Sequence, residues 1–366
     1  MSSRAVRTAA SLCYNFSIKA ILQEAAAAED NGVRRCWRKG EFKMTNSPYY
    51  DVVALGELLV DFTERGVSER GNLLFEANPG GAPCNFLAML AKLGRRTAFI
   101  GKVGDDAFGR MLCTRAAGAG IDVSGVRFDA DFPTTLAVVH NTPGGDREFS
   151  FYRNPGADVM LRAEEVDMAK IESSHVFHFG TLSATSEPAR SATYAAVECA
   201  KRSGCVVSFD PNLRLNLWPD AGSAREQIAC GLSRCDVLKI SDDEIEFMTG
   251  EKDISRGVEI LLARRNIPLV LATMGPEGSR AFYRGRSVFA PPFRMPGMID
   301  ATGAGDTFCG CAVHFVLKYG LDDLSEAKLT EMLTFANAAA ALVTTRRGAL
   351  CVMPEPQDIL SLVNSR

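Results

Sequence analysis

The residues best suited to chemistry lie in one short segment, Asp300-Ala301-Thr302-Gly303-Ala304-Gly305-Asp306. Small residues follow it, a pattern that predicts a helix beginning at the glycines. Glycine lets backbone N–H groups approach an anion closely, and a helix start offers unpaired amides and the positive end of the helix dipole. A carboxylate beside such an anion pocket is suited to take a proton from a hydroxyl group that attacks the anion. The segment therefore indicates a phosphoryl-transfer site.

The composition limits the class of protein. With 366 residues, the chain can hold one large α/β domain with an appendage, or two smaller domains. Hydrophobic residues make up 46% and charged residues 23%, as in ordinary globular proteins. A net charge of −3 argues against a nucleic-acid partner and against a basic membrane-binding face. No apolar run approaches the roughly 20 residues that a membrane helix needs, so no membrane partner is expected.

Cysteine and histidine spacing gives no sign of a metal site. The 11 cysteines include no Cys-x-x-Cys pair, and the four histidines form no cluster in the sequence. We therefore interpret the thiols as reduced, which favours a reducing compartment and predicts a cytoplasmic location.

Residues 1–48 differ in composition from the rest of the chain. Up to Gln23 the segment has basic residues and serines but no acid, which resembles an organelle-targeting presequence. The other interpretation is a disordered, dispensable extension, with the functional start at Met44. Both interpretations stay open, and we expect residues 49–366 to form the folded domain.

From Asp51 onward, apolar strand patterns alternate with helical ones, which predicts β-α-β units and a mainly parallel sheet. The clearest helix runs from Pro83 to Leu93, with proline in its first turn and Gly94 after its end. The expected strands are Val52–Val60, Ala98–Val103, Val176–Phe179, Val206–Phe209, Val237–Ile240 and Leu269–Thr273.

Two segments interrupt this alternation, at about 62–78 and 134–155. The second contains Pro143-Gly144-Gly145-Asp146 between two strand-like runs, which is a hairpin signal. We expect the two segments to form a small β-sheet lid over the ligand-binding edge of the main sheet.

Polar residues follow several of the expected strands, where ligands of open parallel sheets bind. They are Asp61, Asp210 to Arg214, Ser241 to Glu244, and Thr273 to Gly278. Near the front, Asn78 to Asn85 contains a Gly-Gly pair before the Pro83 helix. Asn85 can both donate and accept hydrogen bonds, as a hydroxyl-rich ligand requires.

Several other phosphate-binding or nucleotide-binding classes are excluded by missing motifs. The chain has no G-x-x-x-x-G-K-[ST] and no H-R-D or D-F-G set of the protein kinases. Gly303-Ala304-Gly305 lacks the third glycine of the dinucleotide fingerprint and lies near the C-terminus, so a nicotinamide-dependent oxidoreductase is disfavoured.

These segments together resemble the ribokinase-like (PfkB) carbohydrate kinase family, and within it the fructokinases. The resemblance rests on Pro79 to Asn85 and Asp300 to Asp306 in this order, and covers about Asp51 to Met353. Narrower similarities to fructokinases are Gly56 to Asp61, Phe151 to Pro155, Asp210 to Arg214, and Lys239 to Ser241 with Glu244. The resemblance implies a three-layer α/β/α sandwich with a mainly parallel central sheet and a small β lid.

The resemblance also implies roles for individual residues. Asp306 would be the general base, and the amides of Gly303, Ala304 and Gly305 would form the anion hole. The residues expected to bind the sugar are Asp61, Gly80, Gly81, Asn85, Arg153 and Asn154. The residues expected to bind the nucleotide are Asn212, Arg214, Lys239, Glu244, Thr273, Gly275, Gly278 and Asn337.

Metal ions follow from the same resemblance. Glu244 would hold Mg²⁺ through water, because Mg²⁺ gives up its waters reluctantly. A K⁺ site behind the anion hole would use Asp300, Thr302, Val343, Arg346 and Gly348. Val352 departs from the pattern, since some relatives place a hydroxyl ligand there.

The implied activity is ATP-dependent phosphorylation of fructose at its C6 hydroxyl. Ribokinases themselves usually carry lysine at the position of Ala82, so this residue argues against ribokinase and fits a fructokinase. Two alternatives stay open: a kinase for 2-keto-3-deoxygluconate or another sugar, and a non-catalytic sugar-binding regulatory protein. Phe149, Phe151 and Arg153 share one side of a strand. If Arg153 meets the sugar, the rings of Phe149 and Phe151 would roof the site; the alternative is that these rings pack against the lid of a second subunit in a homodimer.

Overall fold

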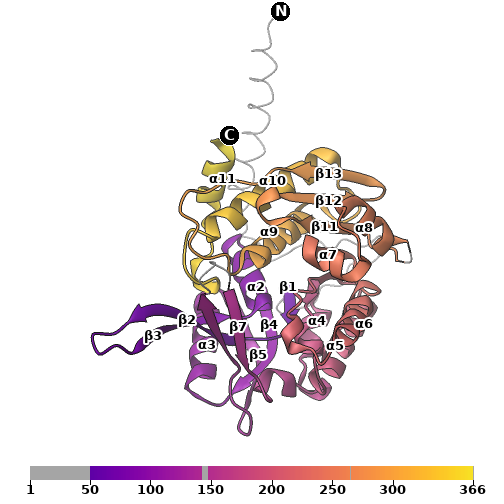
Figure 1. Ribbon diagram of the computed structural model, residues 1–366. Coiled ribbons are helices and arrows are strands. Elements are labelled where there is room, and N and C mark those ends of the chain that lie inside the picture. Colours follow the sequence, from indigo (N-terminus) through magenta and orange to yellow (C-terminus); the bar gives the residue numbers. More distant parts are fainter. Residues whose placement is uncertain (1–49, 142–146, 264, 366) are drawn as a thin grey trace, which may run out of the picture. The chain divides into compact units, whose positions relative to one another are not determined.

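The computed structural model describes residues 50–141, 147–263 and 265–365. The extension expected over residues 1–48 lies outside this part of the chain, and so does the turn expected at Pro143 to Asp146. Figure 1 shows how the described elements are arranged.

The main sheet has nine strands in the order β13-β12-β11-β10-β9-β8-β1-β4-β5 within the described residues. Neighbouring strands are parallel except at β12 and β13, which form an antiparallel hairpin on one edge. The strands are β1 (Tyr50–Leu55), β4 (Thr97–Gly104), β5 (Ile121–Asp129), β8 (Ser174–Phe179), β9 (Val206–Phe209), β10 (Val237–Ser241), β11 (Leu269–Thr273), β12 (Ser279–Tyr283) and β13 (Arg286–Ala290).

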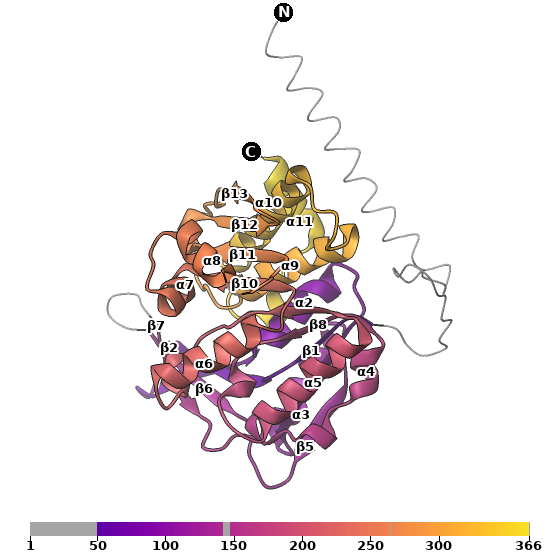
Figure 2. The ribbon, with the colours of Figure 1, turned by 90° about the vertical axis from the view of Figure 1, so that its right-hand side faces the viewer.

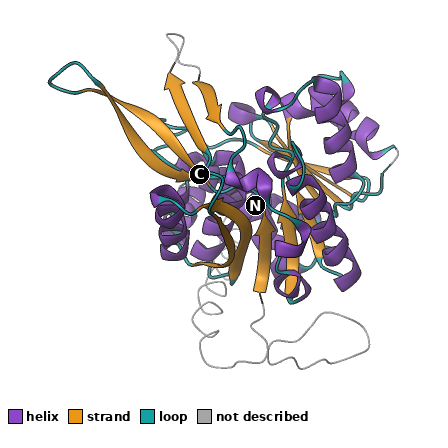
Figure 3. Cartoon of the chain, turned by 90° about the horizontal axis from the view of Figure 1, so that it is seen from below, coloured by secondary structure: helices purple, strands orange, loops and turns teal. Residues whose placement is uncertain are grey.

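Helices cover both faces of this sheet, which explains why β1 and β4 are buried along their whole length. One core cluster packs α4 (Met168–Glu172), α5 (Ala189–Ser203), α6 (Ala221–Leu232), α7 (Asp242–Thr249) and α8 (Ile254–Leu262) against the sheet. The helices that complete the domain are α2 (Ala82–Lys92), α3 (Ala107–Gly118), α9 (Ala304–Tyr319), α10 (Glu326–Val343) and α11 (Pro356–Asn364). Figures 2 and 3 show helices on the two sides of the strands.

The fold class expected from the sequence is confirmed, and most expected elements are present. The helix predicted from Pro83 to Leu93 is α2, displaced by one residue at each end. The single strand expected over Val52–Val60 is wrong: β1 ends at Leu55 and β2 (Leu59–Val67) begins a second sheet. Between the two strands, Glu57 turns inward and accepts a hydrogen bond from the Ala82 amide at 2.9 Å.

The lid predicted from the sequence is a separate four-stranded sheet with the order β3-β2-β6-β7. Besides β2 it contains β3 (Leu73–Gly80), β6 (Leu136–Asn141) and β7 (Arg147–Tyr152). The β6–β7 pair is antiparallel, as the hairpin signal indicated. In Figure 1 the β2 and β3 strands extend away from the main sheet as a long arm.

Helices α2 and α9 pack closely, and this packing brings two distant helix starts together. A side chain at Gly310 in α9 would place its Cβ 2.9 Å from the Phe86 carbonyl oxygen in α2, which is closer than side chains normally approach. Glycine at this position therefore allows the two helices to touch, with Asn85 and Asp306 in their first turns.

Candidate active site

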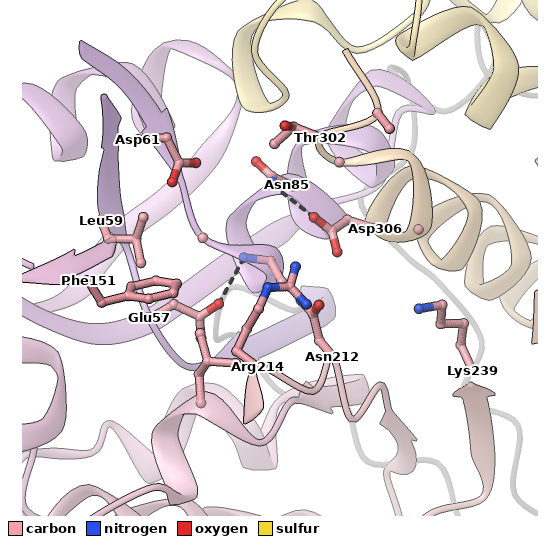
Figure 4. A pocket seen from close by; sticks show the side chains of 16 residues that line it. Glu57, Leu59, Asp61, Asn85, Phe151, Asn212, Arg214, Lys239, Thr302 and Asp306 are labelled. Atoms are coloured by element: carbon pink, nitrogen blue, oxygen red, sulfur yellow. Dashed lines mark hydrogen bonds between the residues drawn. The ribbon is translucent and has the colours of Figure 1, made fainter. Parts of the chain in front are cut away.

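A cavity of about 280 Å³ lies where the first strand, the lid and the start of α9 meet (Figure 4). Its wall combines carboxylates, two amides, two cations and a few apolar side chains, an arrangement suited to a polar ligand. The lining residues are Glu57, Leu59, Asp61, Gly81, Ala82, Asn85, Phe151, Leu182, Asn212, Arg214, Lys239, Ala301, Thr302, Gly303, Gly305 and Asp306.

The predicted base, Asp306, lies in the first turn of α9 and faces this cavity. The helix can begin there because Gly303 adopts φ +78°, a left-handed conformation that favours glycine. Of the predicted anion-hole residues, Gly303 and Gly305 line the cavity and Ala304 does not. The positive end of α9 therefore points at the place where a carboxylate and a bound anion would meet.

Asn85 links the two helix starts by donating a hydrogen bond from Nδ2 to Oδ2 of Asp306 at 2.8 Å. Its Oδ1 is buried and has no hydrogen-bond partner among the described residues. A buried acceptor without a donor is costly, so a hydroxyl group bound here would be stabilised. Burial raises the pKa of Asp306, while Asn85, Lys239 and Arg214 act in the opposite direction.

Asp61 enters the cavity from β2, and Gly80 on β3 makes room for it. A Cβ on Gly80 would lie 2.0 Å from Oδ2 of Asp61, so any other residue would displace this carboxylate. Burial raises the pKa of Asp61 to about 7; Arg214 opposes this, and the carboxylates of Asp300 and Asp306 add to it.

Glu57 is a cavity residue that the sequence reasoning did not assign to the site. It appeared only within the fructokinase-like segment Gly56 to Asp61, whose strand-like pattern gave no sign that Glu57 turns inward. Its carboxylate is buried and accepts the Ala82 amide at the start of α2. Burial raises the pKa of Glu57 to about 7.

An apolar patch on the lid side was only partly predicted. It is made by Leu59, Phe151 and Leu182. Phe151 fits the expectation that a lid ring would roof the site. Nothing in the sequence except their apolar character indicated that Leu59 and Leu182 line the cavity. Their place in its wall depends on how the lid and the chain after β8 come together.

A second cavity, of about 400 Å³, adjoins the first through three shared residues: Asn212, Arg214 and Lys239. It is also lined by Leu213, Ser241, Asp243, Glu244 and Phe247. These residues follow β9 and β10, as expected for ligand-binding positions at the carboxyl ends of parallel strands.

Glu244 is buried in this second cavity, where both of its oxygens accept backbone hydrogen bonds. Oε1 accepts the Leu213 amide and Oε2 the Ser241 amide, each at 2.8 Å. Carboxylate oxygens keep further lone pairs, so this donor fits Mg²⁺ held through water. Among the described residues, no group of three or more His, Cys, Asp or Glu side chains is arranged to hold a metal ion.

Lys239 forms a buried ion pair with Asp210, whose two oxygens lie 3.1 and 3.2 Å from its ammonium nitrogen. Asp210 belongs to the polar segment after β9 but was not predicted as a site residue. Burial raises its pKa to about 7, against the effect of Lys239, with Glu244 and Asp306 acting in the same direction as burial.

Arg153 and Asn154, expected to contact the sugar, do not line either cavity. The Arg153 guanidinium instead donates to Asp158 at 2.6 and 2.8 Å, to the Leu182 carbonyl and to Thr185. Both bonds to Asp158 go to its Oδ2, a buried charge-assisted pair, and a contact of Arg153 with the sugar stays a prediction.

The residues predicted to line the ATP phosphates and ribose (Thr273, Gly275 and Gly278) and the adenine (Asn337) line neither cavity. Thr273 ends β11, and Gly275 and Gly278 form the turn before β12. Asn337 is buried in α10, accepts from Ser279 and donates to the carbonyls of Ala290 and Pro291. Their nucleotide-binding roles stay predictions.

Three of the residues predicted for K⁺ come together behind the anion hole. Asp300 accepts the Thr302 amide at 2.7 Å and the Gly348 amide at 3.3 Å. Val343 is buried at the end of α10, and its carbonyl accepts the Arg346 amide. The Arg346 side chain lies near Asp358.

The comparisons with known proteins identify the family. The model of the pfkB family carbohydrate kinases matches residues 50–356, and the chain belongs to this family. It is 41% identical to Fructokinase-1 of Zea mays over 314 residues, which cover 85% of this chain and 97% of the relative. It is also 41% identical to the probable fructokinase-2 of Arabidopsis thaliana over 318 residues, covering 85% and 95%.

Solved structures agree with this assignment. A fructokinase from Xylella fastidiosa with bound ATP has a TM-score of 0.77 at 29% identity, covering 86% of this chain and 99% of that one. A fructokinase from Vibrio cholerae, in a form that binds fructose, ADP and potassium, also has a TM-score of 0.77 at 29% identity, covering 87% and 100%. The chain is thus a fructokinase-like carbohydrate kinase, a phosphotransferase with an alcohol group as acceptor.

The raised pKa of Glu57 gives a pH test of the site. The folded state keeps a proton on Glu57 up to about pH 7, whereas the unfolded chain loses it near the ordinary value of 4.5. Stability should therefore fall by up to about 3 kcal/mol over this range because of Glu57 alone.

The variant Glu57→Gln keeps an acceptor for the Ala82 amide and removes the titration. Urea unfolding of both proteins across this range should show the variant gaining relative stability as pH rises; parallel curves would contradict the burial of an ionisable group here.

Proposed function

We propose that the protein transfers the γ-phosphoryl group of ATP to the C6 hydroxyl of fructose, giving fructose 6-phosphate and ADP. The observation that carries this proposal is the Asp306 carboxylate at the start of α9, hydrogen-bonded to Asn85 and facing the cavity. Its raised pKa suits a general base at neutral pH.

In the proposed step, the bond from the C6 oxygen to the γ-phosphorus forms while the bond from that phosphorus to the bridging oxygen of ADP breaks. The hydroxyl proton passes to Asp306. The first amides of α9, at Gly303, Ala304 and Gly305, stabilise the negative charge of the transferred group. Because phosphoryl transfer leaves little covalent work to the protein, positioning and charge stabilisation dominate the rate.

The sugar would bind between β2, β3 and the start of α2. The Asp61 carboxyl group can bind sugar hydroxyls, and Gly80 and Gly81 leave space for them. The Oδ1 atom of Asn85, which has no donor among the described residues, can accept a hydrogen bond from a hydroxyl. Closure of the lid, which carries Phe151 on β7, would exclude water and limit ATP hydrolysis.

We expect an uncharged sugar to be preferred over 2-keto-3-deoxygluconate. A sugar carboxylate in this cavity would approach the carboxyl groups of Glu57 and Asp61. The cations among the described lining residues are Arg214, which already acts on Asp61 and Asp306, and Lys239, which is paired with Asp210.

The phosphate groups of ATP would lie between the two cavities, near Arg214 and Lys239. Thr273, Gly275, Gly278 and Asn337 would complete the nucleotide site. Mg²⁺, held through water by Glu244, would neutralise phosphate charge when bound. Asp300, Thr302 and Gly348 would form part of a K⁺ site. A relative's structure with ATP and Mg²⁺, a putative ribokinase II from E. coli, supports the nucleotide and metal assignments by similarity.

We also propose a homodimer formed through the lid. The β2–β3 arm exposes the apolar side chains of Val67, Leu73, Leu74 and Phe75, which would be more stable against a partner than in water. Sedimentation of the full chain should show a dimer, and Leu73→Glu should shift it toward monomer. Ile260→Glu, at an exposed apolar residue on α8, is the control and should leave the dimer intact. A wild-type monomer at all concentrations would contradict this proposal.

Asp306→Asn tests the central role of the base. The variant keeps the size and one acceptor oxygen but cannot take the proton, so turnover should fall by about 10²–10⁴-fold. ATP binding by titration calorimetry and the melting temperature should remain close to wild type. Near-normal turnover would remove Asp306 from the base role.

A panel of sugars with coupled detection of ADP tests the substrate. We expect kcat/KM to be highest for fructose, lower for ribose and lowest for 2-keto-3-deoxygluconate. A preference for the acid sugar would contradict the proposed substrate. Binding of fructose without turnover of any sugar would favour the regulatory alternative.

A further inference from the structure

The buried ion pair of Asp210 and Lys239 borders the two cavities, although an ion pair that only stabilised the fold would not have to lie there. Lys239 comes from β10, and Asp210 follows β9, the neighbouring strand. Both side chains are almost completely buried. Yet Lys239 lines both cavities, so its ammonium borders the space through which a transferred group must pass.

The ammonium also lies beside the anion hole. A Cβ added to Gly305 would be 3.2 Å from the Lys239 nitrogen, and glycine at this position leaves that approach open. Figure 4 shows the Lys239 side chain pointing across the cavity toward the start of α9. An ammonium carries three N–H donors, and its hydrogen bond within the described residues goes to Asp210.

Asp210 is itself held in place from two sides. Its amide donates to the Phe179 carbonyl at the end of β8, and its Oδ1 accepts the Asn212 amide at 3.1 Å. Such a fixed carboxylate restricts a flexible lysine side chain, which would otherwise adopt several rotamers.

We propose that Asp210 is a positioning residue that holds the Lys239 ammonium at the boundary of the two cavities, where it contacts the oxygens of the phosphoryl group in transit. This inference rests on the proposed function, in which transfer occurs beside Asp306. Lys239 stabilises charge that spreads over the transferred group, and Asp210 acts only through Lys239.

The charges around Lys239 favour its cationic form. Burial lowers the pKa of Lys239, but the carboxylates of Asp210, Glu244 and Asp306 together raise it above its ordinary value. The ionisable groups facing the pair from the surrounding elements are Arg214 after β9, His178 on β8, Glu244 on α7, and Asp306 and Cys309 on α9. Without Asp210, Glu244 and Asp306 remain to oppose burial, so the pKa of Lys239 is expected to fall.

The test is a double-mutant cycle with Asp210→Asn and Lys239→Met, measured as kcat and KM for fructose and ATP. Each single variant should lower kcat by about 10- to 100-fold, with smaller changes in KM. The double variant should be no worse than Lys239→Met, because Asp210 works through Lys239. Asp210→Asn should also add an alkaline limb to the pH profile of kcat, and Asp210→Glu should recover part of the rate.

Asp129→Asn is the control. It removes one carboxylate of a largely buried cluster in which Lys102 pairs with Asp129 at 3.0 Å and with Glu165 at 2.7 Å. None of these residues lines either cavity, so kcat should stay at the wild-type value. If Asp210→Asn does not fold, the double variant can still be measured, because it leaves no unpaired buried charge. Its kcat then tests the role of the ion pair.

Wild-type kcat in Asp210→Asn or in the double variant, or losses that multiply in the double variant, would overturn the inference. Asp306→Asn measured alongside separates the two hypotheses. An active Asp306→Asn enzyme contradicts the proposed function, whereas an inactive one combined with an unaffected Asp210→Asn enzyme contradicts only the role of the pair.

Discussion

The hydrogen bond from Asn85 to Asp306 joins two helix starts that are 221 residues apart in the chain. It can form only because α2 and α9 pack closely, which Gly310 allows. The same packing buries Asp306 and leaves the second amide atom of Asn85 without a partner among the described residues. Folding therefore creates both a carboxyl group with a raised pKa and an acceptor that a sugar hydroxyl can satisfy.

The charged groups of the two cavities come from different elements. The carboxyl groups of Glu57 and Asp61, after β1 and on the lid strand β2, line the first cavity. Arg214 and Lys239, from the ends of β9 and β10, line both cavities, and Asp243 and Glu244 add carboxyl groups to the second. The two cations therefore lie at the shared boundary, where the proposed reaction brings a neutral alcohol to a polyanion.

The sequence predicted the fold class, the lid and the core of the site because these depend on local patterns. The sequence alone reveals glycines before a helix, as at Gly303, and polar residues after apolar strands. Glu57 was missed because its inward turn depends on the Ala82 amide, a contact between separate elements. The bond between Arg153 and Asp158, five residues apart in the chain, was not predicted, and a contact of Arg153 with the sugar stays a prediction. Such choices between partners are decided by tertiary packing.

The most direct test of the account is a crystal structure of the full chain with fructose and a non-hydrolysable ATP analogue. The account predicts the C6 hydroxyl within hydrogen-bonding distance of the Asp306 carboxylate, another sugar hydroxyl donating to the free oxygen of Asn85, and the γ-phosphate over the first turn of α9. A sugar bound with a different hydroxyl toward Asp306, or a γ-phosphate away from Gly303 and Gly305, would contradict it.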